Sequence, residues 1–382
     1  MIACDAGDPA EEVTETMSAP SDDPRTTTRP LRVVQWTTGN VAHETVRAIL
    51  ERSDLELVGC YARSASKAGK DVAELVGLDA PTGVRATGDV AALLALEPDC
   101  VVYTPLYFDA DEVAQILRAG VDVVTSCEFL TGRSLPAGQR DAVEAAALAG
   151  GATIFGSGMN PGYSAMLGAV GAAISRDVRH VRISESVDVT LFAADSNMDA
   201  LGWGRRKGDA GHARDVEHAV RVFHDGLDVL GELLGVRDFE RRCVVEFAHA
   251  TEDLDVPGRD VRAGTVAGID VRFIGVVGGV ERFELHQRWV MGSKIDPPWK
   301  IEHGYLVVVD ANPRIRLKLD IWPDLDDLGK LTVDEMHAIG MRITGLPLVN
   351  AIPKVCAAAP GIRTYGDLPL VGTCLAARRS HA

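Results

Sequence analysis

The segment that most constrains the fold runs from Arg32 to Leu50. A short apolar strand at residues 33–36 is followed by the turn Thr38-Gly39-Asn40 and by apolar residues at helical spacing from Val41 to Glu51. A strand, a tight turn and a helix form the opening of a dinucleotide-binding unit, because the helix N-terminus offers free N–H groups to a pyrophosphate.

The glycine fingerprint of such units is incomplete here. Against the pattern G-x-G-x-x-G, Gly39 stands at the middle position, while Thr37 and Ala42 occupy the flanking ones. The motif alone is weak, so its weight depends on the strands and helices that come after it in the chain. We expect the turn to contact a cofactor through Thr38, Gly39, Asn40 and Val41.

Strands and helices alternate through the rest of the first half of the chain. The predicted strands after the first are residues 55–62, 84–86, 99–104, 120–126 and 152–155. Alternation with helices of this kind predicts a parallel, doubly wound Rossmann domain over residues 31–157.

The second half has a different pattern. Strand-like runs without intervening helices cover residues 178–192, 242–251, 261–277 and 280–291, followed by the hairpin 306–309/315–321. They predict a substrate-binding α+β domain with a mostly antiparallel sheet over residues 158–345. The segment 346–382 is expected to pack back on the first domain.

Length and charge limit the class of protein. The 382 residues suffice for two domains, and the net charge of −16 argues against nucleic-acid or anionic membrane partners. No apolar run approaches the length of a membrane span. Residues 1–30, rich in Asp, Glu, Thr, Ser and Pro, read as a disordered acidic tail rather than a secretory signal, and Met17 is a possible start.

The seven cysteines are scattered and never form a C-x-x-C pair, so we expect no disulfide framework or zinc site and a reducing, cytoplasmic location. His212, His218 and His224 lie six residues apart, which is wrong for an i, i+4 metal pair, and are interpreted as surface histidines. No metal is expected.

The end of the second strand indicates which nicotinamide cofactor fits. An acid there would bind a ribose 2′-OH, whereas this chain carries Arg63, Ser64 and Lys67, which suit a 2′-phosphate. NADP is favoured and NAD stays possible. The alternative is a solvated basic loop.

Ligands of doubly wound sheets bind beyond the carboxyl ends of the strands. The residues expected there as cofactor contacts are Thr104, Pro105, Cys127 and Asn160, whose amide suits a carboxamide such as that of nicotinamide. Glu128 is the acid that directly follows a strand in these segments. A loop glutamate is usually solvated surface, but this position favours a functional role.

Four segments carry a resemblance to a known family. They are Trp36-Thr-Thr-Gly-Asn-Val41, Ser126-Cys-Glu128, Gly156-Ser-Gly-Met-Asn-Pro-Gly162, and Asn350-Ala-Ile-Pro353 with Ala359-Pro-Gly361. Residues 31–370 resemble the 2,4-diaminopentanoate dehydrogenases and native amine dehydrogenases, which are distantly similar to dihydrodipicolinate reductases. The His-His-x-x-Lys segment of the latter is absent, which disfavours lysine biosynthesis.

The resemblance implies that Glu128 serves the amine chemistry and that the protein is a homodimer, its second domain supplying the dimer sheet and the substrate pocket. The expected reaction is NADPH-dependent, reversible reductive amination of a small ketone or aldehyde with ammonia. The expected pocket residues are Phe129, Tyr163, Met166, Trp203, His286 and Thr344. Trp203 either closes the site or is a buried anchor. For His286 and Thr344 the alternative is a purely structural role.

Three other functions stay open. One is an NADP-dependent oxidoreductase that acts on C=O, and another uses a 2,4-diaminopentanoate-like substrate. The third is a non-catalytic NADP-binding sensor.

Overall fold

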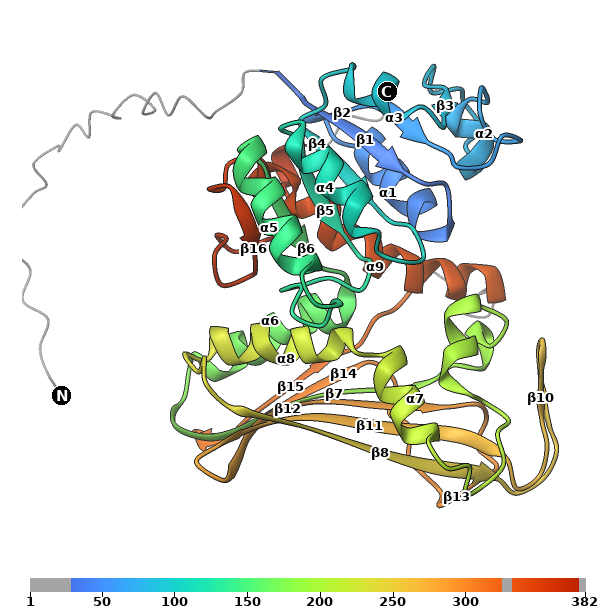
Figure 1. Ribbon diagram of the computed structural model, residues 1–382. Coiled ribbons are helices and arrows are strands. Elements are labelled where there is room, and N and C mark those ends of the chain that lie inside the picture. The colour runs from blue at the N-terminus through green and yellow to red at the C-terminus, as the bar shows by residue number, and fades with distance from the viewer. Residues whose placement is uncertain (1–28, 325–331, 378–382) are drawn as a thin grey trace, which may run out of the picture.

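The computed structural model describes residues 29–324 and 332–377. Most of the predicted acidic tail, including Met17, lies outside these residues. Two seven-stranded sheets stand one above the other, with helices between them (Figure 1). Among the described residues, no helix is long and apolar enough to cross a membrane.

The first sheet is parallel throughout, in the order β16-β6-β5-β4-β1-β2-β3. Its strands are β1 (Leu31–Trp36), β2 (Leu55–Tyr61), β3 (Ala86–Thr87), β4 (Cys100–Tyr103), β5 (Asp122–Thr125), β6 (Thr153–Gly156) and β16 (Gly361–Arg363). The helices between them are α1 (Asn40–Leu50), α2 (Val72–Val76), α3 (Val90–Leu94), α4 (Ala110–Arg118) and α5 (Gln139–Gly150). This is the predicted doubly wound domain, with β16 as a strand that the sequence did not indicate.

The second sheet has the order β13-β8-β11-β12-β7-β14-β15. Its strands are β7 (Arg176–Asp188), β8 (Glu240–Ala250), β11 (Val266–Val277), β12 (Val280–Val290), β13 (Ile295–Asp296), β14 (Tyr305–Asn312) and β15 (Ile315–Leu319). Only the pair of β12 with β7 is parallel among the described neighbours, so the prediction of a mostly antiparallel sheet is confirmed.

Three predicted elements have different bounds. The first long run ends at Asp188, where a short 3-10 helix, η2 (Thr190–Phe192), begins. The run 261–277 is divided, because β10 (Arg259–Val261) pairs with β9 (Leu254–Val256) as a separate hairpin. The helix predicted at 215–234 is two helices, α7 (His212–Ala219) and α8 (Val222–Leu233).

Helices cover one face of the second sheet, the face toward the first sheet (Figure 1). Helix α6 (Ser164–Ala172) and α8 pack there. A Cβ atom on Gly226 of α8 would lie 3.0 Å from the Leu285 side chain and 2.5 Å from the Pro161 ring. This close packing shows that Leu285 faces α8, and therefore that its neighbour His286 faces away from it.

Helix α9 (Val333–Cys356) begins with a capping box between Thr332 and Glu335 and packs against α1 of the first domain. A Cβ on Gly345 would lie 2.7 Å from the Thr45 side chain, which explains a glycine at this crossing. The boundary expected at residue 345 thus falls inside one continuous helix.

Candidate active site

The turn after β1 leaves a helix N-terminus open. Gly39 caps α1 with φ −86°, no side chain caps the helix, and its first turn carries no acidic residue. A Cβ on Gly39 would meet nothing within 4 Å. Within residues 29–324 and 332–377, no acceptor binds the N–H groups of Asn40, Val41 and Ala42, so they stay available to an anion.

Thr37 has the backbone shape of the missing first glycine. Its φ is 80°, a left-handed value that is rare for a β-branched residue. Its N–H donates to the Tyr61 carbonyl (3.0 Å) and its hydroxyl to the Thr104 carbonyl (3.2 Å). Neighbouring strands thus hold the strained residue in place, and the geometry of the fingerprint survives without its glycine.

The basic loop after β2 reaches this turn. The Lys67 ammonium donates to the Thr38 hydroxyl (2.8 Å), and the Ser64 and Ser66 hydroxyls lie 2.7 Å apart. The side chain of Arg63 is 72% exposed, with its guanidinium 3.9 Å from the Glu112 carboxylate. The contact with Thr38 therefore places Lys67 beside the open helix N-terminus, and Arg63, Ser64 and Ser66 belong to the same loop.

Two predicted cofactor contacts have side chains that are engaged elsewhere. The buried Thr104 hydroxyl accepts from the Gln35 amide (2.8 Å) and donates to the Trp36 carbonyl (3.2 Å). The buried Cys127 thiol donates to the Pro105 carbonyl (2.7 Å), and burial raises the pKa of this thiol to about 12. A cofactor contact at Thr104 or Cys127 is therefore left to the backbone.

Glu128 lies shortly after the end of β5 and binds Arg221, a cation that the sequence did not indicate. Its Oε2 accepts a hydrogen bond from the guanidinium of Arg221, which directly precedes α8. The two side chains are 26% and 28% exposed. The partners are far apart in the sequence and no local motif links them, so only the folded chain reveals the pair.

The amide of Asn160 faces the second sheet. Its Nδ2 donates to Glu185 (3.0 Å) and Gln287 (2.7 Å), and its Oδ1 accepts from Ser164 (3.0 Å). The carboxyl of Glu185 also accepts from Trp289 (2.8 Å) and Tyr305, and burial raises its pKa. In place of the expected hydrogen bond to a carboxamide, the Asn160 amide is bound by two strands of the second sheet, β7 and β12.

Three expected pocket residues lie in apolar packing. Phe129 is buried and stacks on Phe108 with ring centroids 4.9 Å apart. Met166 of α6 is part of the main core. Trp203 is buried and packs in the main core, which favours the anchor over the closing lid.

The remaining expected pocket residues divide between the site and other surfaces. A Cβ on Gly158 would lie 3.7 Å from the Thr344 methyl and 3.9 Å from Ser126, so Thr344 stands at the strand ends. Tyr163 is half-buried. His286 was wrongly placed, because it lies on the far face of the second sheet and binds Asp270 at 2.8 Å.

Two further expectations concern metal binding and the histidines of residues 212–224. Within the described ranges, no cluster of three His, Cys, Asp or Glu residues could hold a metal ion. His212, expected on the surface, is buried: its ring stacks on Phe247 of β8, with centroids 4.3 Å apart, and its Nε2 lies 2.7 Å from the Leu201 carbonyl oxygen.

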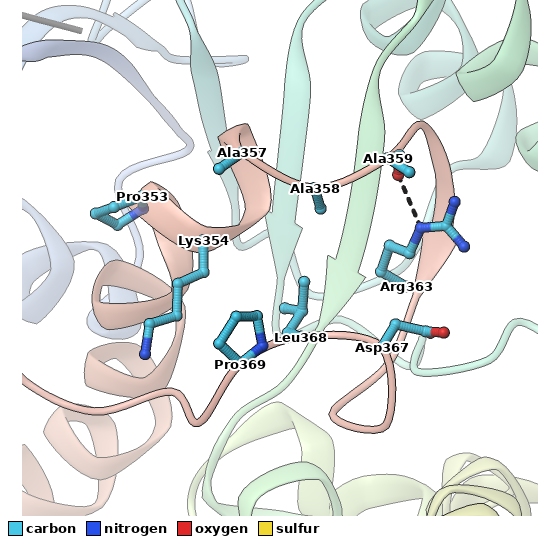
Figure 2. A pocket seen from close by; sticks show the side chains of 9 residues that line it. All are labelled: Pro353, Lys354, Ala357, Ala358, Ala359, Arg363, Asp367, Leu368 and Pro369. Carbon is cyan, nitrogen blue, oxygen red and sulfur yellow. Dashed lines mark hydrogen bonds between the residues drawn. The ribbon is translucent and has the colours of Figure 1, made fainter. Parts of the chain in front are cut away.

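A cavity of about 480 Å³ lies between the end of α9 and β16 (Figure 2). Residues from Pro353 to Pro369 line it, including Lys354, Ala359 and Arg363. The Ala359 carbonyl accepts from the hydroxyl of Thr153, the first residue of β6. The cavity thus lies at the opposite end of the strands from Gly39 and Glu128 and contains none of the predicted site residues.

No protein-family model matches the chain. An amine dehydrogenase of Streptomyces virginiae is 26% identical over an alignment of 361 residues that covers 89% of this chain and 96% of that protein. The solved structure of an amine dehydrogenase from Mycobacterium smegmatis has a TM-score of 0.72 at 21% identity, covering 90% of this chain and 97% of its own. The predicted resemblance is therefore confirmed: the chain is similar to amine dehydrogenases over most of its length, shares their two-part fold, and is an oxidoreductase.

Proposed function

We propose that the protein catalyses NADPH-dependent, reversible reductive amination of a small ketone or aldehyde with ammonia. The observation that carries the proposal is Glu128, a partly exposed carboxylate just past a strand end, on the edge of the sheet where α1 presents its open N-terminus. The similarity to an amine dehydrogenase supports the choice of an amine over other oxidoreductase substrates.

The residues after β1 and β2 fit a phosphorylated dinucleotide. The open N–H groups at Gly39 suit the pyrophosphate, and Arg63, Ser64 and Lys67 suit a 2′-phosphate. When bound, the nicotinamide supplies the reducing equivalents. The residues of the chain bind and orient the cofactor and the substrate, accept protons and stabilise charge.

Glu128 has two tasks in this scheme. Its carboxylate stabilises the positive charge of an iminium, and it accepts a proton from ammonium or the carbinolamine. Arg221 binds Oε2, and no hydrogen bond within the described residues reaches Oε1. A carboxylate has about four acceptor positions, so the pair leaves room for a substrate nitrogen.

The test measures NADPH oxidation with a panel of small ketones and aldehydes, with and without ammonia. Turnover that requires ammonia supports the proposal. Equal turnover without ammonia identifies a carbonyl reductase, and NADPH binding without turnover of any compound identifies a sensor; either result rejects it.

The 2′-phosphate assignment predicts that Arg63→Ala lowers kcat/KM with NADPH about 10-fold and leaves kcat/KM with NADH unchanged. One charge-assisted hydrogen bond is worth about 1.5 kcal/mol, and the side chain is exposed. Steady-state kinetics with both cofactors measure the change. Arg237→Ala is the matched control, because Arg237 is 86% exposed and also lies 3.9 Å from a carboxylate. Equal losses with both cofactors would contradict the assignment.

We propose further that the protein is a homodimer joined through the helix-free face of the second sheet. That face buries charge: Asp270 is bound by His286 (2.8 Å) and Arg288 (2.7 Å), and Glu284 is bound by Arg182. Because these charges are already paired within the sheet, a second copy can cover the face without leaving them unpaired. Light scattering is expected to give twice the mass of one chain, and the mass of a single chain would reject the dimer.

A further inference from the structure

One carboxylate accepts hydrogen bonds from four backbone N–H groups of the loop that follows Glu128. Asp225 of α8 is fully buried. Its Oδ2 accepts the N–H groups of Leu130 (3.3 Å), Thr131 (2.9 Å) and Gly132 (2.8 Å), and its Oδ1 accepts that of Ser134 (2.8 Å). Four amides of a single loop thus converge on one side chain.

Burying the carboxylate and the loop N–H groups is unfavourable unless they bind one another. A buried carboxylate without partners costs several kcal/mol, and four buried N–H groups without acceptors are also unfavourable. In the part of the chain that the structure describes, every hydrogen bond to the Asp225 carboxylate comes from the loop and none comes from α8 itself. The loop needs this carboxylate, because residues 130–134 form no strand or helix that could accept their N–H groups.

Asp225 lies on the same side of the start of α8 as Arg221, the residue that binds Glu128. Arg221 precedes Asp225 by four residues, so the two side chains project from the same side, one turn apart. Arg221 binds the Glu128 carboxylate, and Asp225 binds the backbone that begins two residues after Glu128. One helix of the second domain therefore sets the position of a loop of the first.

We propose that Asp225 is a positioning residue for Glu128: by binding the amides of Leu130, Thr131, Gly132 and Ser134, it fixes the Glu128 side chain relative to α8 and the substrate domain. The inference rests on the proposed function of Glu128. It makes the active site a feature of the domain junction, not of the Rossmann domain alone.

The main test is Asp225→Asn in the full-length protein. The amide keeps one acceptor oxygen but turns an NH₂ group toward backbone donors, so the loop shifts. We expect kcat for reductive amination to fall on the order of 10- to 100-fold, since a displacement of about 1 Å has this effect, while the Kd for NADPH stays unchanged. Glu144→Gln is the matched control: Glu144 also binds a backbone N–H, that of Ile362, but at the β16 edge of the sheet.

A double-mutant cycle separates positioning from general destabilisation. In the Glu128→Gln background, Asp225→Asn should lower the residual kcat less than about 2-fold, because its effect acts through Glu128. Equal losses in both backgrounds would overturn the proposal, and so would an Asp225→Asn enzyme with at least half the wild-type kcat.

Hydrogen exchange on the wild-type protein needs no variant. The amides of Thr131, Gly132 and Ser134 should exchange as slowly as those of α8, whereas exchange as fast as in the Arg63–Lys67 loop would refute the clamp. Absence of any ammonia-dependent turnover in the wild type would instead reject the proposed function, while slow exchange at these amides would still show that the clamp exists.

Discussion

Replacing Glu128 with Gln is expected to lower kcat for reductive amination about 100- to 1,000-fold. Loss of a preorganised charge that stabilises a developing ion costs this much in enzymes, and loss of a general base costs a comparable factor. The amide keeps the size of the side chain and an oxygen that accepts from Arg221. The change therefore removes charge and basicity while largely preserving the shape of the loop.

The measurement is steady-state NADPH oxidation with saturating ketone and ammonia, combined with NADPH binding followed by fluorescence. Binding should stay within about 2-fold of the wild type, because Glu128 is not assigned to the cofactor. Glu217→Gln is the matched control: Glu217 is a partly exposed carboxylate of α7 that binds His224 at 3.1 Å. Near wild-type turnover by Glu128→Gln would reject the proposed mechanism.

Glu128 could be selected from the sequence because parallel strands bring their carboxyl ends to one edge of a sheet. Strand alternation alone places the segments after β1, β4, β5 and β6 together, and the structure has this sheet. Arg221 and Asp225 could not be selected in the same way. They come from a helix boundary more than 90 residues further along the chain, and nothing local distinguishes them from other charged residues of an amphipathic helix.

The misplaced residues show where pattern reasoning fails. The strand pattern of residues 280–291 could not show that α8 covers the face of Leu285 and leaves His286 on the other side. Asn160 was selected for its position after β6. Its amide is bound instead by Glu185 and Gln287, acceptors from two strands of the second sheet. Both outcomes depend on which segments pack on the second sheet, which a single-sequence pattern does not encode.

Thr37 shows the opposite case, in which a motif looks weaker in the sequence than in the structure. The first fingerprint glycine is expected because the turn needs a positive φ, and Thr37 adopts φ 80° without being glycine. Hydrogen bonds to the carbonyls of Tyr61 and Thr104 offset part of the strain. The shape of the turn after β1 is therefore held by the strands on either side, not by the residue alone.

The second large effect is expected at Gly39. Gly39→Val should raise the Kd for NADPH at least about 100-fold and leave the free energy of unfolding within about 0.5 kcal/mol of the wild type. The backbone φ of −86° suits any residue, and the new side chain would meet no protein atom near its Cβ. It would instead fill the space in front of the α1 N-terminus. Losing two charge-assisted hydrogen bonds to a phosphate, at about 1.5 kcal/mol each, gives a change of this size.

Gly138→Ala is the control that should give the opposite pattern. Gly138 also caps a helix, α5, but with φ 82°, so an alanine there should cost about 1 kcal/mol of stability and leave NADPH binding unchanged. Fluorescence titration and chemical denaturation measure both quantities on both variants. If Gly39→Val bound NADPH as the wild type does, the phosphates would not lie at α1. Glu128 would then have no reduced nicotinamide beside it, because both assignments depend on the same edge of the parallel sheet.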